Sequence, residues 1–104
     1  MAEFMFIYHG GGMPETEEEG AKMMAAWGAW MENHAAVMTN PGAPVGRSVT
    51  VTAQGVTQDG GANPTTGFTI VDVADEATAI EIAKGCPILD GGNGSVEIAP
   101  LVQL

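Results

Sequence analysis

Residues 67–101 constrain the fold more than any other part of the chain, because they contain a complete strand–helix–strand pattern. The pattern is a strand, a capped helix, a stop and a second strand, over residues 67–73, 75–84, 85–87 and 95–99. Asp75 is a typical helix N-cap, and Gly85 is a typical residue just past a helix C-terminus. This half of the chain therefore predicts two strands joined by one short helix.

The chain begins with a strand that is apolar on both faces, at residues 4–8. A strand of this kind is usually covered on both sides. One helix layer covers only one face, so we expect a second subunit to cover the other. His9 and the glycines at residues 10–12 end the strand.

A long helix is predicted next, starting at Thr16. Thr16 and Glu19 have the spacing of a capping box, and acidic residues 17–19 favour the positive end of the helix dipole. We interpret the glutamates as a solvated first turn; a divalent-metal site is the alternative. The helix is expected to end near Met38 or Thr39, because Pro41 follows.

Residues 48–52 alternate strictly and are rich in β-branched side chains, which predicts a half-buried edge strand. The connection at residues 54–66 is rich in turn residues, and Val56 and Thr57 could lengthen a hairpin there. The complete order is βαββαβ. It predicts one domain over residues 1–104, a ferredoxin-like α+β sandwich whose four-stranded antiparallel sheet has its first and third strands in the centre.

Charge excludes several classes of partner. Three basic residues against thirteen acidic ones give a formal charge of −10, so no phosphate-binding or anionic-membrane surface is expected. No apolar run approaches the roughly 18 residues that span a bilayer. One cysteine fits a reducing compartment. We therefore expect a cytoplasmic protein without nucleic-acid or membrane partners.

Strand direction predicts which end of the sheet each loop and each histidine reaches. Three glycine-rich connections, at residues 9–13, 54–66 and 86–94, should meet at one end of the sheet, where they serve as tight turns or let backbone approach a ligand. None matches a phosphate-binding fingerprint. His9 lies at that end, and His34 lies about 27 Å away along the helix, so the two histidines cannot share a metal ion within one chain. A two-histidine site would need a dimer that brings opposite ends together. We expect no metal and no cofactor.

Each histidine has two interpretations. His34 is either a core-margin residue or a general base oriented by Asp72, which should reach the same end of the sheet. His9 could pair with Asp59 or Asp90 from the neighbouring loops. The candidate catalytic residues are therefore His9, His34 and Asp72.

The helix also carries a stripe of tryptophan and methionine, which is either core or one wall of an apolar pocket. The candidate ligand-binding residues are Tyr8, Trp27, Trp30, Met31 and Asp90. Cys86 follows a helix end, where the dipole disfavours a thiolate, so we interpret it as a buried packing residue rather than a nucleophile.

Several short motifs, at residues 4–8, 23–30, 67–73, 79–87 and 96–101, together resemble the YCII-related family, which includes the group named for a DGPF motif. The resemblance implies a dimeric α+β barrel, in which the sheets of two ferredoxin-like protomers pack together. Some members are proposed to use a His–Asp pair, one group dehydrochlorinates chlorinated aromatic hydroxyquinones, and others accompany alternative sigma factors. In relatives with the pair, the histidine stands near the position of Met24, and only Asp59 and Gly60 match the DGPF motif here.

The sequence is compatible with two functions. One is a lyase- or isomerase-type enzyme that acts on an apolar or aromatic substrate in a helix–sheet cleft, with a histidine base. The other is a non-catalytic homodimer that binds a ligand or a partner protein. The sequence does not decide whether the protein is an enzyme.

Overall fold

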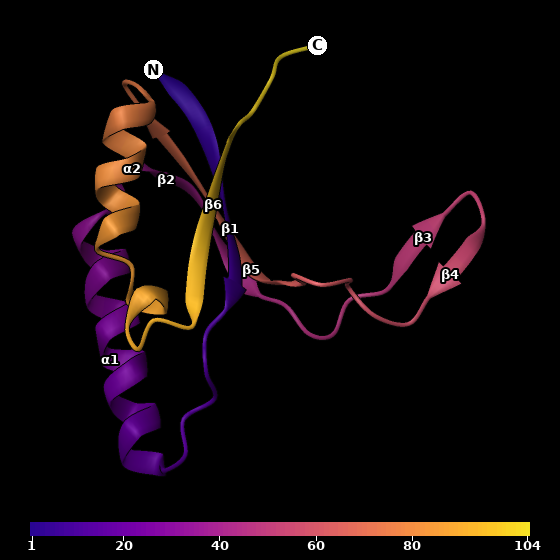
Figure 1. The fold of residues 1–104 in the computed structure, drawn as a ribbon. Coiled ribbons are helices and arrows are strands. Elements are labelled where there is room, and N and C mark those ends of the chain that lie inside the picture. Colours follow the sequence, from indigo (N-terminus) through magenta and orange to yellow (C-terminus); the bar gives the residue numbers. More distant parts are fainter.

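The computed structural model describes residues 1–104 and has two helices on one face of a four-stranded antiparallel sheet (Figure 1). The sheet strands are β1 (Ala2–Gly10), β2 (Met38–Pro44), β5 (Thr65–Val73) and β6 (Gly94–Pro100), and the helices are α1 (Glu17–Asn33) and α2 (Glu76–Lys84). The order across the sheet is β2-β5-β1-β6. The predicted ferredoxin-like α+β class, with the first strand central, is thus confirmed.

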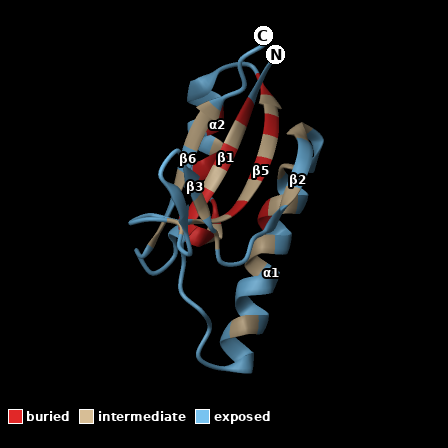
Figure 2. Cartoon of the chain, turned by 90° about the vertical axis from the view of Figure 1, so that its right-hand side faces the viewer, coloured by how far each residue is buried: buried red, intermediate tan, exposed pale blue.

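The register of the central strands separates two faces. Phe4 pairs with Val71 on β5 and with Pro100 on β6, so alternate positions on the three strands point the same way. Phe4, Phe6 and Tyr8 on β1 are buried beneath the helices, together with Val71 and Val73 on β5. Alternation directs the intervening side chains to the other face. No helix covers that face (Figures 1 and 2).

The helix layer is held by caps and by aromatic packing. Thr16 Oγ1 accepts from Glu19 N at 3.1 Å, and Asp75 Oδ1 accepts from Thr78 N at 2.9 Å, so both predicted N-caps are confirmed. The Thr78 hydroxyl also donates to Asp75 Oδ1, at 2.7 Å. This bond and, to a smaller extent, the bond from Thr78 N hold the pKa of Asp75 below its usual value. Trp30 is buried against Phe6, and its indole Nε1 donates to Ile82 O at 3.1 Å.

The second sheet strand is not where the sequence predicted it. Residues 38–44 form β2 at the sheet edge, whereas Thr50–Thr52 form β3, which pairs only with β4 (Gly55–Thr57) in a separate hairpin. From the sequence, Pro41 indicated only the end of the first helix, and no strand was predicted at residues 40–47. Proline lacks the N–H of a ladder donor, but an edge strand tolerates Pro41 and Pro44 because one of its sides has no partner. The alternation at residues 48–52 indicated a strand but not its partner.

The first helix ends at Asn33, earlier than the predicted Met38 or Thr39. Its C-cap is His34, and a 3₁₀ turn at Ala35–Val37 leads directly into β2. Met38 pairs with Val71, which requires extended backbone at that position. Sheet pairing therefore overrides the helical spacing of Val37 and Met38.

Candidate functional site

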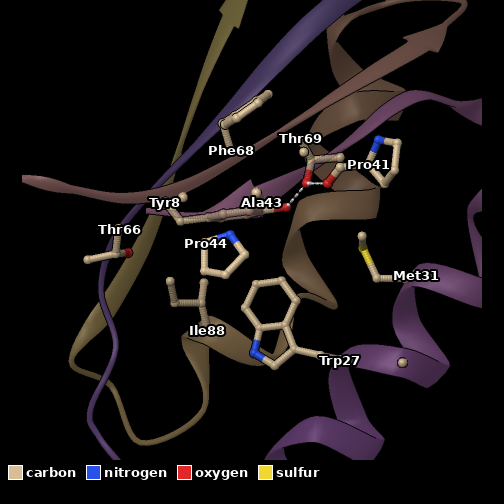
Figure 3. A pocket seen from close by; sticks show the side chains of 13 residues that line it. Tyr8, Trp27, Met31, Pro41, Ala43, Pro44, Thr66, Phe68, Thr69 and Ile88 are labelled. Carbon is tan, nitrogen blue, oxygen red and sulfur yellow. Dashed lines mark hydrogen bonds between the residues drawn. The ribbon is translucent and has the colours of Figure 1, made fainter. Parts of the chain in front are cut away.

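A pocket of about 340 Å³ opens between α1, β2 and β5, on the helix side of the sheet. Figure 3 shows its walls: Trp27 and Met31 from the helix, Tyr8 and Thr69 from the central strands, and the proline-rich strand β2. Apart from a few hydroxyl groups and backbone atoms, the side chains are apolar. Its size and lining are those of a small-molecule site.

One chain of hydrogen bonds provides the polar feature of the pocket. The Tyr8 hydroxyl donates to Thr69 Oγ1 at 2.7 Å, and Thr69 Oγ1 donates to Pro41 O at 2.9 Å. Burial raises the pKa of Tyr8 to about 12, with the nearby Cys86 adding a smaller increase, although the Thr69 hydrogen bond opposes both. The phenol is therefore neutral at physiological pH. Its single proton is committed to Thr69, and its oxygen lone pairs remain available as acceptors.

Aromatic rings and glycines shape the space. Trp27 packs edge-to-face on Tyr8, with ring centroids 5.2 Å apart and an interplanar angle of 81°. A side chain at Gly28 would meet no atom within 4 Å, so this glycine leaves the helix wall open. Gly42 has φ of +74°, and a Cβ there would collide with Phe68 O, so only glycine lets β2 approach β5 at this point.

The predicted ligand-binding residues fall into three groups. Tyr8, Trp27 and Met31 line the pocket. Trp30 lies beneath it in the core and does not line it. Asp90 lines an adjoining hollow of about 270 Å³ that shares Trp27 with the pocket.

His9 lies on the opposite face of the sheet from the pocket. Its ring is 8 % exposed, with Nε2 at 2.9 Å from Glu97 Oε1 and Nδ1 at 3.2 Å from Pro64 O. Both neighbours are acceptors, so the arrangement is fully satisfied when both ring nitrogens carry protons. The Glu97 hydrogen bond raises the pKa of His9 despite the opposing effect of burial. Its carboxylate partner is Glu97, and not Asp59 or Asp90 as expected.

The structure does not bring His34 and Asp72 together. His34 caps α1 and packs edge-to-face on Trp30, with ring centroids 5.8 Å apart, so it lies on the helix side. Asp72 lies between the buried Val71 and Val73 on β5, and alternation therefore directs its carboxyl group to the uncovered face. No hydrogen bond or ion pair joins the two side chains.

Other reactive groups give no second site. Cys86 is buried, and desolvation raises the pKa of its thiol to about 11, so it is not an activated nucleophile. No cluster of three or more His, Cys, Asp or Glu side chains could hold a metal ion. Neither helix is long and apolar enough to cross a membrane.

Sequence reasoning missed Thr69 and Glu97. Thr69 is in phase with the buried Val71 on β5, so the alternation marks it as a polar residue on the core face. Glu97 is diagonal to His9, since β6 pairs Ser95 with His9 and Glu97 with Ile7. Strand register therefore identifies Glu97 as the partner of His9, whereas composition does not. The β2 wall had no such signal, because Met38 and Thr39 were predicted to end the helix and residues 40–44 were assigned to no strand.

Comparison with solved structures supports the fold. The chain superposes on 5-chloro-2-hydroxyhydroquinone dehydrochlorinase from Burkholderia phenoliruptrix AC1100, determined in complex with 2,5-dihydroxybenzoquinone, with a TM-score of 0.54 and 17 % identity. The match covers 90 % of this chain and 89 % of that one. At this level of identity the likeness concerns the fold alone.

Sequence comparison identifies the family. No protein with a curated function matches the chain. The model of the YCII-related domain matches residues 4–104, which is nearly the whole sequence. The chain therefore belongs to the YCII-related family.

Proposed function

We propose that the protein binds a small aromatic ligand carrying at least one hydroxyl group in the pocket between α1, β2 and β5. The observation that carries this proposal is the pocket's combination of apolar walls with one oriented oxygen, Tyr8 Oη. Because Tyr8 donates to Thr69, a ligand hydroxyl would donate to Tyr8. The apolar walls would bury the ring.

Trp27 supplies a direct test, because it lines the pocket whereas Trp30 does not. A panel of phenols and hydroquinones should quench tryptophan fluorescence saturably, and Trp27→Phe should remove that quenching. Methoxy analogues, which lack the donor, should bind more weakly. A ligand at 100 times its Kd should also stabilise the fold by about 2.7 kcal/mol. Failure of every phenol to bind would refute the proposal.

A second candidate is an elimination or isomerisation with a histidine base, and His9 favours it. A base held by a carboxylate is a recurring catalytic arrangement, and the His9–Glu97 distance of 2.9 Å fits it. Proton abstraction would require His9 to lose its Nδ1 proton and the Nδ1–Pro64 contact to open. The substrate would then bind on the uncovered face of the sheet, and not in the pocket. Turnover of a hydroxyquinone panel should then disappear in His9→Ala and persist in His34→Ala; turnover that survives both changes would exclude a histidine base.

We further propose that the working unit is a homodimer formed through the uncovered sheet face. This face, called the open face below, presents Met5 and Ile7 from β1 with Phe68 and Ile70 from β5, all only half-buried. These four side chains are adjacent in the register, since Met5 pairs with Ile70 and Ile7 with Phe68. A contiguous apolar patch in the centre of a sheet face usually indicates a covering partner. Sedimentation at micromolar concentration tests this, because a purely monomeric protein would contradict it.

A further inference from the structure

Residues 45–64 form a projecting arm that the pocket does not use. The arm leaves the sheet on the side away from the helices and carries β3 and β4 at its end (Figure 1). Its root is closed by Val45 N, which donates to Thr66 O at 3.0 Å. The Cα radius of gyration is 14.9 Å, against about 13 Å for a compact chain of this size.

The end of the arm lacks a core of its own. Its two strands have three residues each, and a hairpin of that size is marginally stable alone. Val51 and Val56 face each other across it, 75 % and 60 % exposed, and Val49 is 52 % exposed. Three exposed valines on a projecting element indicate a surface that meets another molecule.

The arm and the open face lie on the same side of the sheet (Figures 1 and 2). A body that covers Ile7 and Ile70 therefore also lies beside the arm. An isologous dimer satisfies both surfaces at once, since each copy offers one arm and one open face. A smaller ligand would cover only one of them.

Charge also favours a second copy of the chain. Arg47 is the only basic residue of the arm, and it forms no ion pair within the chain, unlike Lys22 and Lys84. The open face carries Asp72 and Glu97, and Asp72 Oδ1 is buried without a hydrogen-bond partner. The arm thus has the apolar groups and the positive charge that complement the open face of another copy.

We propose that the arm of each copy clasps the open face of its partner, with the Val51–Val56 pair on the apolar strands and Arg47 beside the acidic side chains. This inference rests on the proposed homodimer and names the element that closes it. The arm root adjoins Pro44 and Thr66, which line the ligand pocket. Clasping would therefore fix one wall of the pocket in each copy.

The central experiment is sedimentation equilibrium of Val51→Asp/Val56→Asp, with Ala21→Asp/Ala25→Asp on the exposed side of α1 as a control of equal added charge. The arm variant should raise the dimer Kd at least tenfold, whereas the helix control should leave it within about threefold. Circular dichroism should show that both retain the fold. An unchanged Kd in the arm variant would overturn the clasp while leaving the dimer intact. A monomeric native protein would overturn both.

Two charge-reversal variants test the contribution of Arg47 to the dimer. Arg47→Glu should weaken the dimer several-fold, and Lys22→Glu, which makes the same charge change on α1, should have a smaller effect. Equal effects would contradict a specific role for Arg47.

Crosslinking tests where the arm binds on the partner copy. A photoreactive benzoylphenylalanine at position 51, in a mixture of isotopically light and heavy chains, should give mixed-label products that join the arm to β1 or β5. Products formed only within one chain would overturn the clasp.

Discussion

At the residue scale, the proposed ligand recognition would depend on the Tyr8 hydroxyl, which lines the pocket and donates to Thr69. Tyr8→Phe keeps the ring that packs on Trp27 and removes the acceptor. Loss of one hydrogen bond is worth about 1 kcal/mol, so phenolic ligands should bind roughly five- to tenfold more weakly. Titration calorimetry would measure the change.

The control for Tyr8→Phe is a methoxy analogue, which cannot donate to Tyr8 and should bind the variant and the native protein alike. Thr69 keeps its hydrogen bond to Pro41 O in the variant. If the substitution weakened both ligand types equally, Tyr8 would act by shape and not as an acceptor.

The His9–Glu97 pair predicts a pH dependence of stability. The folded pKa of His9 is raised above 6.5, mainly by the Glu97 hydrogen bond. The contribution of the pair is therefore complete below the unfolded pKa and is lost as pH rises through the folded pKa. Because the Glu97 side chain is 62 % exposed, the contribution should be about 1 kcal/mol or less.

The measurement is urea unfolding of the native protein and Glu97→Gln at a series of pH values. The native protein should be the more stable one near pH 6, and the difference should shrink toward pH 9. A difference that grew with pH would mean that His9 is neutral when paired.

At the element scale, Gly28 offers a way to close the pocket without disturbing the core. It lies on α1 with open space where a side chain would project. Gly28→Leu should therefore occlude the pocket and abolish binding, whereas Gly28→Ala should largely retain binding. Both remove a helix-interior glycine, so unfolding free energies should rise by roughly 0.5–1 kcal/mol.

Thermal unfolding of Gly28→Leu and Gly28→Ala would measure their stability, and ligand titration would measure their binding. Native-like binding by a folded Gly28→Leu protein would place the ligand elsewhere.

Local signals predicted most elements but not their partners. A short apolar run identified β1, and caps and stop residues identified α2 between β5 and β6, because these patterns depend on neighbouring residues. The assignment of β2 failed since Pro41 and Pro44 are compatible with a strand only at a sheet edge, which is a property of the assembled sheet. The valines of residues 48–52 alternate in the same way whether the partner strand is in the main sheet or in a hairpin.

In the candidate site, too, local patterns predicted individual residues but not the residues that they contact. Tyr8, Trp27 and Met31 were accessible to prediction because they lie on predicted apolar faces. The pairing of His9 with Glu97 depends on the register between β1 and β6, and the two residues are 88 positions apart in sequence. Long-range register of this kind has no local signature.

At the scale of the whole molecule, the formal charge of −10 on each chain should oppose dimerisation. The Debye length is about 10 Å at 0.1 M salt, so repulsion between exposed charges on two copies would be largely screened at longer distances. An ion pair made by Arg47 inside the interface would be screened less. Added salt should therefore remove more repulsion than attraction. We expect the dimer Kd to fall several-fold between about 0.02 M and 0.2 M sodium chloride.

Sedimentation equilibrium at four salt concentrations would measure this dependence, and Arg47→Glu sharpens its interpretation. That variant replaces an attraction with a repulsion, so its dimer should tighten more steeply with salt than the native one. A native dimer that weakened as salt rose would mean that ion pairs, and not apolar contacts between the arm and the open face, dominate the interface.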